Sequence, residues 1–157
     1  MRNVTAVLIV AIFATGLASA QMKAPPQKPT GPLSVSTPTV PAAQSLESAQ
    51  RIPRDEAIRL VKSGKAVYVD VRSRQSYATA HIPGAISIPR SEMLNRLREM
   101  PPGKMLITYC ACKEAEHTSA LAVLELNAHG IRNTAALLGG WNEWKAAGLP
   151  TSTGDRP

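Results

Sequence analysis

The stretch MLITYCACKEAEHTSA at residues 105–120 decides the fold. An apolar, β-like run over residues 105–109 stops at Cys110, and a short polar loop then leads into a helical pattern. Both cysteines of the protein, Cys110 and Cys112, lie in this loop. The unpaired amides of a loop and of a first helical turn favour an anion over a neutral group, so this arrangement is typical of a reactive thiolate.

Strands and helices alternate on both sides of this stretch. The pattern predicts strands over residues 66–71, 86–88, 105–109 and 134–138, and helices over residues 53–62, 91–100, 117–128 and 141–147. Such alternation favours an α/β domain with a mostly parallel sheet that helices cover on both faces. Sites in these sheets form beyond the carboxyl ends of the strands, and Cys110 follows the most apolar strand.

The first twenty residues have the features of an export signal. Arg2 precedes an uncharged apolar run over residues 4–17, and residues 18–20 (Ala-Ser-Ala) form a small-x-small cleavage site. An uncleaved membrane anchor is the alternative, but the run is shorter than the roughly 20 residues that a spanning helix needs. We therefore expect an exported, periplasmic or secreted protein, without stable membrane insertion after cleavage.

Composition divides the chain of 157 residues into four segments. Residues 1–20 are the expected signal peptide, and the proline-rich residues 21–50 are expected to form a disordered linker. Residues 51–150 are the expected folded domain, and residues 151–157 a flexible tail.

Charge and cysteine content exclude other classes of protein. The formal net charge is +7, but the basic residues form no run and only 4% of residues are aromatic, so nucleic-acid binding is not expected. Two cysteines separated by one residue cannot link distant parts of a fold. Stability must therefore come from the core, which leaves both cysteines free for chemistry.

Three motifs resemble those of the rhodanese-like domains, in that family's order. They are Asp70-Val71-Arg72 with Tyr77 and the run His81 to Pro89, then Ile107 to Cys110, and finally Leu138 to Trp144. The resemblance covers about residues 52–150. The resemblance implies a small three-layer rhodanese-like domain with a central, mostly parallel sheet flanked by helices.

The resemblance also implies sulfur transfer. A thiolate takes sulfane sulfur from thiosulfate or a persulfide, holds it as a persulfide and passes it to a thiol or another nucleophile. By position Cys110 is the nucleophile, and the substrate-binding loop comprises Ala111, Cys112, Lys113, Glu114, Ala115, Glu116, His117, Thr118 and Ser119. The expected partners are a small sulfur donor and a thiol acceptor, including an exported protein, and no cofactor is expected.

The loop departs from an oxyanion-clamping pattern. Glu116 stands at the sixth position after Cys110, where phosphatase-type loops carry an arginine that clamps phosphate, so phosphatase or arsenate-reductase chemistry is disfavoured. Lys113 against Glu114 and Glu116 leaves one negative charge, which repels a dianion such as thiosulfate unless the acids point outward. A persulfide donor fits at least as well.

The second cysteine leaves several interpretations open. Cys112 is either a resolving thiol that attacks an oxidised or sulfur-loaded Cys110, or only a loop residue. A metal site from Cys110, Cys112 and His117 is disfavoured because structural zinc sites use four ligands. A thiol redox protein and a non-catalytic rhodanese-fold binding module therefore stand beside the sulfurtransferase.

Other polar and aromatic residues have expected supporting roles. Asp70 and Arg72 are interpreted as a structural ion pair at a strand's carboxyl end. His117 either stabilises the thiolate or is an ordinary first-turn residue. Trp144 is expected in the core, and Trp141 at the rim of the pocket.

Overall fold

The computed structural model describes residues 45–113 and 116–156. The predicted signal peptide, most of the predicted linker, and Glu114 and Ala115 lie outside the described residues. Within the described part of the chain, no helix is long and apolar enough to cross a membrane.

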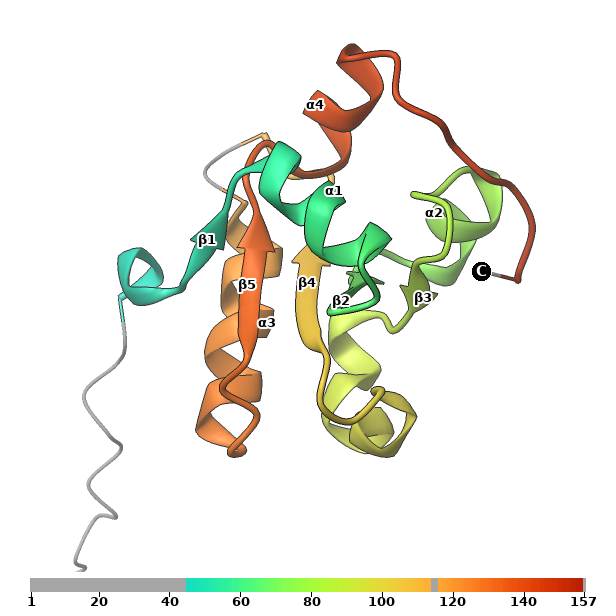
Figure 1. Ribbon diagram of the computed structural model, residues 1–157. Coiled ribbons are helices and arrows are strands. Elements are labelled where there is room, and N and C mark those ends of the chain that lie inside the picture. Colours follow the sequence, from blue (N-terminus) through green and yellow to red (C-terminus); the bar gives the residue numbers. More distant parts are fainter. Residues whose placement is uncertain (1–44, 114–115, 157) are drawn as a thin grey trace, which may run out of the picture. The chain divides into compact units, whose positions relative to one another are not determined.

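A five-stranded sheet in the order β1-β5-β4-β2-β3 forms the centre of the domain (Figure 1). Its strands are β1 (Arg51–Ile52), β2 (Ala66–Asp70), β3 (Ile86–Ser87), β4 (Met105–Tyr109) and β5 (Thr134–Leu137). Every strand pair is parallel, which confirms the predicted α/β class. Because β4 is central and its last four residues are buried, the chain leaves the middle of the sheet at Cys110.

Helices cover both faces of the sheet. One face packs against α1 (Arg54–Lys62), α2 (Arg74–Thr79) and α4 (Gly140–Ala146), and the other against α3 (His117–Ala128) and the 3₁₀ segment η2 (Arg90–Glu99). Figure 1 shows α1 in front of the strands and α3 behind them. The expected three-layer arrangement is therefore present.

The alternation of side chains along β4 decides where Cys110 points. Ile107 and Tyr109 belong to the core under α1 and α4, whereas Leu106 and Cys110 belong to the core under α3 and η2. Thr108 has the same parity as Cys110, and its hydroxyl donates a 3.0 Å hydrogen bond to the carbonyl of Ser119 in α3. The Cys110 side chain is thus directed toward the start of α3.

Local structure differs from the sequence predictions at several places. The predicted linker extends to residue 50, whereas residues 45–50 contain the 3₁₀ turn η1 (Leu46–Ser48) and a buried Ala49. The short strand β1 and helix α2 are absent from the predictions. In α2 only Tyr77 is buried, so the helix leaves no apolar period, and its one local signal is the Ser73 cap, whose hydroxyl accepts from the Ser76 amide at 3.2 Å.

The predicted helix over residues 91–100 is 3₁₀ rather than α-helical. Non-helical backbone angles at Arg96 interrupt it, and Met93 is buried while Leu94 is 45% exposed. A 3₁₀ helix turns a third of a circle per residue, so consecutive apolar residues separate more widely than in an α-helix. Met93 and Leu94 therefore do not share a buried side of this segment.

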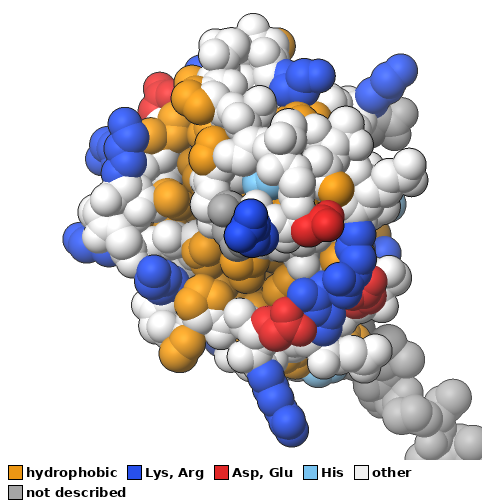
Figure 2. Space-filling view, turned by 90° about the vertical axis from the view of Figure 1, so that its right-hand side faces the viewer, with side chains coloured by type: hydrophobic (Ala, Val, Ile, Leu, Met, Phe, Trp, Pro, Cys, Tyr) orange, Lys and Arg blue, Asp and Glu red, His pale blue; other side chains and the backbone are white. Residues whose placement is uncertain are grey.

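Charged residues of α2 and η2 pair on the surface. Arg74 contacts Glu92 at 2.5 Å, and Arg96 contacts Glu99 at 2.5 Å and Glu92 at 3.2 Å. Figure 2 shows basic and acidic side chains next to one another on this face. Exposed pairs of this kind contribute little stability, but they balance the local positive charge.

Two buried tyrosines give a direct test of the core. Tyr77 donates a 2.6 Å hydrogen bond to the carbonyl of Ala85, whereas the Tyr68 hydroxyl has no partner among the described residues. Tyr77→Phe should lower the free energy of unfolding by about 1–3 kcal/mol because a buried carbonyl loses its donor. Tyr68→Phe should be neutral or stabilising. Urea denaturation at neutral pH measures both, and equal losses would contradict the assignment.

Tyr68 also predicts that the stability of the fold depends on pH. Burial raises the pKa of Tyr68 to about 12 from 10.0. The unfolded chain then loses this proton before the folded protein does, so the stability present below about pH 10 declines as the pH rises toward about 12. In Tyr68→Phe the decline should be shallower, but not absent, because burial also raises the pKa of Tyr109. Denaturation curves across this range provide the measurement.

Candidate functional site

Cys110 is held at the carboxyl end of β4 by the start of α4. Its carbonyl accepts a 2.9 Å hydrogen bond from the Trp141 amide, and its side chain is 4% exposed. Gly140 has φ +48°, and a Cβ at this position would lie only 2.5 Å from the Cys110 carbonyl oxygen. Only glycine therefore permits this close approach between the two chain segments.

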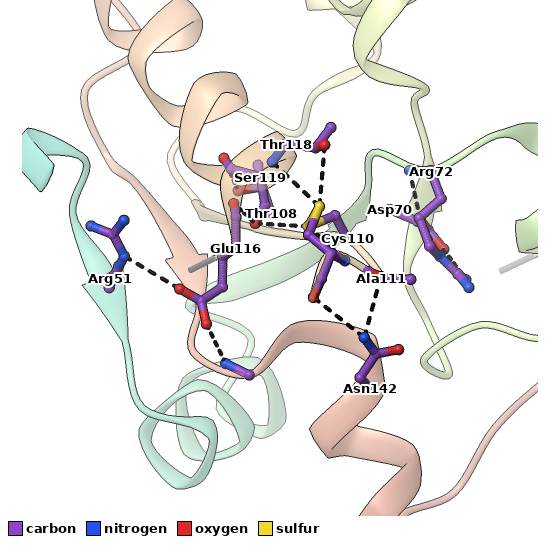
Figure 3. Close-up of a disulfide and its surroundings, with 12 residues drawn as sticks. Arg51, Asp70, Arg72, Thr108, Cys110, Ala111, Glu116, Thr118, Ser119 and Asn142 are labelled. Atoms are coloured by element: carbon purple, nitrogen blue, oxygen red, sulfur yellow. Dashed lines mark hydrogen bonds and ion pairs between the residues drawn. A yellow bond between two sulfur atoms is a disulfide. The ribbon is translucent and has the colours of Figure 1, made fainter. Parts of the chain in front are cut away.

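The two cysteine sulfurs are joined in a disulfide, with Cα atoms 5.5 Å apart (Figure 3). The Cys112 amide lies 3.4 Å from Cys110 Sγ, and Ser119 Oγ lies 3.6 Å from the same sulfur. Thr118 approaches Cys112 Sγ with its amide at 3.4 Å and its hydroxyl at 3.2 Å. N–H and O–H groups thus surround both sulfurs, and in the reduced protein they would stabilise thiolates.

Asn142 fixes the turn that connects the two cysteines. Its side-chain amide donates to the carbonyls of Ala111 at 3.2 Å and Cys112 at 3.3 Å. In a trans peptide the N–H points away from the C=O, so holding the Ala111 carbonyl outward directs the Cys112 N–H inward. That N–H is the one that faces Cys110 Sγ.

Glu116 is turned away from the cysteines. It adopts a left-handed conformation (φ 51°) as the N-cap of α3, and its carboxylate accepts a 2.8 Å hydrogen bond from the Gly139 amide. It also pairs with Arg51 Nε at 3.4 Å. Figure 3 shows the side chain extending toward Arg51 rather than toward the sulfurs, so its charge is compensated there.

Asp70 and Arg72 support the site from the neighbouring strand. Asp70 is fully buried and accepts from the Arg72 amide at 3.0 Å, from its Nε at 2.9 Å and from Nη2 at 2.5 Å. The Arg72 guanidinium lies 4.4 Å from the centre of the Trp141 ring. The ion pair therefore braces the residue whose amide holds the Cys110 carbonyl.

Tyr109 immediately precedes Cys110 and is fully buried. Burial and, next, the negative charge of Asp70 raise its pKa well above the usual range. Its hydroxyl accepts a 3.2 Å hydrogen bond from the Ile82 amide. The phenol is therefore neutral and structural rather than a base for the neighbouring thiol.

Comparisons with known proteins agree with this architecture. The model of the rhodanese-like domain matches residues 53–147. The chain belongs to the rhodanese family. It is 35% identical over 116 residues to the HTH-type transcriptional regulator Rv0324 of Mycobacterium tuberculosis, which is 73% of this chain but only 50% of that protein.

This rhodanese-like chain is also similar to two proteins described as thiosulfate sulfurtransferases. The thiosulfate sulfurtransferase GlpE of Coxiella burnetii is 28% identical over 107 residues, covering 68% of this chain and 96% of that protein. The crystal structure of a thiosulfate sulfurtransferase from Pseudomonas aeruginosa superimposes with a TM-score of 0.61 at 30% identity, covering 70% of this chain and 21% of that chain.

The rhodanese loop is only partly assembled around the sulfurs. Cys110, Cys112, Thr118 and Ser119 come together, whereas Ala111, Lys113 and His117 are exposed. Glu114 and Ala115 lie outside the described residues. Within residues 45–113 and 116–156, no three His, Cys, Asp or Glu side chains are grouped so as to hold a metal ion.

Three residues of the site, Asn142, Arg51 and Gly140, have no role assigned to them from the sequence. Asn142 and Arg51 leave no local signal, because their partners are 31 and 65 positions away. The Gly139-Gly140 pair predicts a turn, but not that position 140 contacts Cys110. Two consecutive glycines are the signal that could have indicated this contact. Most turns need only one glycine, so the second suggests a close approach of another chain segment.

A shallow hollow of about 270 Å³ opens beside the loop. It is lined by Cys112, Lys113, Glu116, Gly139, Asn142 and Glu143. Cys110 is not among these lining residues, so the hollow leads to the second cysteine.

The close approach at Gly140 predicts a specific mutational effect. Gly140→Ala combines a positive φ with a collision against the Cys110 carbonyl, whereas Gly130→Ala has a positive φ of 85° and no atom within 4 Å. Gly130→Ala should cost about 1–2 kcal/mol of unfolding free energy from backbone strain alone. Gly140→Ala should cost clearly more, and in the reduced protein it should speed alkylation of the displaced Cys110.

Chemical denaturation and mass-spectrometric alkylation rates measure the two effects. If both variants lose the same stability and keep the same Cys110 alkylation rate, the contact with Gly140 does not position the cysteine.

Proposed function

We propose that this protein is a sulfurtransferase that carries sulfane sulfur as a persulfide on Cys110. The Cys110 thiolate attacks the outer sulfur of a donor, and sulfite or a thiolate leaves. A nucleophilic thiol then takes the outer sulfur from the persulfide and regenerates the Cys110 thiolate. The observation that carries the proposal is the placement of Cys110 Sγ beside the Cys112 amide at 3.4 Å and Ser119 Oγ at 3.6 Å.

The surroundings of Cys110 support an anionic sulfur. The side chain is 4% exposed, so its thiolate depends on protein donors rather than on water. The Cys112 amide supplies one donor, and the Ser119 hydroxyl, which donates at 2.9 Å to the Glu116 carbonyl, can supply a second by rotating toward the sulfur. The α3 helix also begins nearby with its partial positive end. A terminal persulfide sulfur is an anion of the same kind, so this environment suits both states of the carrier.

The charge of the loop favours a persulfide donor over thiosulfate. Thiosulfate is a dianion, and among the described loop residues (111–113 and 116–119) Lys113 is the only Lys or Arg, with an exposed side chain. Glu116 lines the hollow beside Cys112, but its carboxylate pairs with Arg51 and accepts from the Gly139 amide, so its repulsion of the donor is weakened. Backbone amides are sufficient for a singly charged persulfide.

The first twenty residues support a location for the proposed reaction. Their pattern of one basic residue, an apolar run and Ala-Ser-Ala supports export to an oxidising compartment. The acceptor would then be an exported thiol, carried either by a small molecule or by a protein.

Sulfur loading tests the proposal directly. The Cys112→Ser variant, in which the disulfide cannot form, is reduced and incubated separately with thiosulfate and with glutathione persulfide. Peptide mass spectrometry should find one added sulfur atom on Cys110, and loading by the persulfide should be faster by about tenfold or more, as expected for differential charge stabilisation of about 1.4 kcal/mol.

Cys110→Ser is the matched control, and it should acquire no sulfur at this position. The proposal fails if folded, reduced Cys112→Ser protein gains no sulfur from either donor.

A further inference from the structure

The two cysteines differ in access although they share one disulfide. Cys110 is 4% exposed and packs in the core beneath α3 and η2. Cys112 is only half-buried and lines the hollow beside Lys113 and Asn142. In the disulfide form, a molecule approaching from solvent therefore meets the sulfur of Cys112 first.

We propose that Cys112 resolves the Cys110 persulfide, so that the transferred sulfur leaves as hydrosulfide, and that a dithiol reductant then reopens the site by attacking Cys112. The proposal rests on the proposed function, since sulfur must first be loaded on Cys110. It adds a second product, a second substrate class and a role for Cys112.

The first step is an attack on the inner sulfur of the persulfide. The Cys112 thiolate forms a bond with Cys110 Sγ, the bond between this Sγ and the outer sulfur breaks, and the outer sulfur departs with the electron pair as hydrosulfide. The sulfane sulfur is thereby reduced, and the two cysteines are oxidised to the disulfide. Cys112 Sγ can reach the inner sulfur because the structure joins these two atoms.

The Cys112 thiolate has its own stabilising groups. The Thr118 amide and hydroxyl lie 3.4 Å and 3.2 Å from Cys112 Sγ. These donors favour the ionised form, which is the attacking species in thiol exchange. In the reduced protein the Thr118 amide can donate to the Cys112 thiolate, and the Thr118 hydroxyl can rotate to donate as well.

The second step restores the dithiol. One thiolate of the reductant attacks Cys112 Sγ, the disulfide breaks, and Cys110 departs as a thiolate that the Cys112 amide and Ser119 hydroxyl already contact. The reductant's second thiol then attacks its own sulfur in the mixed disulfide, releases Cys112 and leaves as an oxidised disulfide. The reductant attacks Cys112 rather than Cys110 because Cys112 is the more exposed of the two. This attack releases Cys110, the nucleophile of the next cycle, directly as a thiolate.

Hydrosulfide release separates this inference from simple sulfur transfer. Reduced wild-type protein and Cys112→Ser are each given one equivalent of glutathione persulfide under anaerobic conditions, without another acceptor. Wild type should release up to one equivalent of hydrosulfide and gain the Cys110–Cys112 disulfide. Cys112→Ser should keep the sulfur on Cys110 and release at least about tenfold less hydrosulfide, since an effective intramolecular nucleophile is lost.

Each outcome separates the two proposals. A stable persulfide on Cys110 in both proteins would overturn the resolving role while leaving the sulfurtransferase intact. Loading in neither protein would overturn the sulfurtransferase. Wild-type protein incubated without a donor should remain a dithiol. Disulfide formation in this control would show that another oxidant is present, and it would contradict the attack of Cys112 on the persulfide as the source of the disulfide.

A separate experiment tests which of the two cysteines the reductant attacks. The oxidised wild-type protein is treated with glutathione, quenched rapidly with an alkylating agent and mapped by mass spectrometry. Glutathione should be found on Cys112 and the alkyl group on Cys110. The reverse distribution would overturn entry through the hollow.

Discussion

The hydrogen bond from the Trp141 amide to the Cys110 carbonyl is the constraint on which the site depends. It joins the end of the central strand β4 to the beginning of α4, and it requires the close approach that Gly140 permits. With its carbonyl held on the α4 side, Cys110 presents its sulfur on the α3 side, where Ser119 and Thr118 begin the helix. Arg72 stacks on Trp141, and buried Asp70 holds Arg72, so the constraint extends into the neighbouring strand β2.

Glu116 connects the same turn to the edge of the sheet. Its carboxylate receives the Gly139 amide and pairs with Arg51 of β1, so one side chain joins the start of α3, the turn before α4 and the edge strand. The negative charge of Glu116 therefore has a structural role, because the Gly139 amide and Arg51 bind it. A rhodanese loop without arginine can then stabilise a singly charged sulfur by amides and hydroxyls alone, which is the physical basis for the proposed preference for a persulfide over a dianionic donor.

Local patterns in the sequence predict the parts of the molecule that depend on local rules. The apolar run over residues 105–109 predicts the central strand and the position of Cys110. The predicted helix over residues 117–128 coincides with α3. Long-range partners are different. Neither Arg51 with Glu116 nor Asn142 with Ala111 leaves a periodic signal, because each contact is created only when the sheet is assembled. The 3₁₀ geometry of η2 is likewise a tertiary outcome, since its residues are compatible with an α-helix.

The spacing of the cysteines links stabilisation of the Cys110 thiolate to the proposed resolution of its persulfide. One peptide group, between Ala111 and Cys112, carries both consequences: its carbonyl is bound by Asn142, and its amide faces Cys110 Sγ at 3.4 Å. Turning that amide inward also turns the Cys112 backbone toward Cys110, which brings the second sulfur within bonding reach. With a single intervening residue, the loop cannot supply the amide without also delivering the thiol. Replacing the Cys112 side chain therefore removes the second sulfur but keeps the amide, and this is why the two roles of position 112 are chemically separable even though they arise from the same turn.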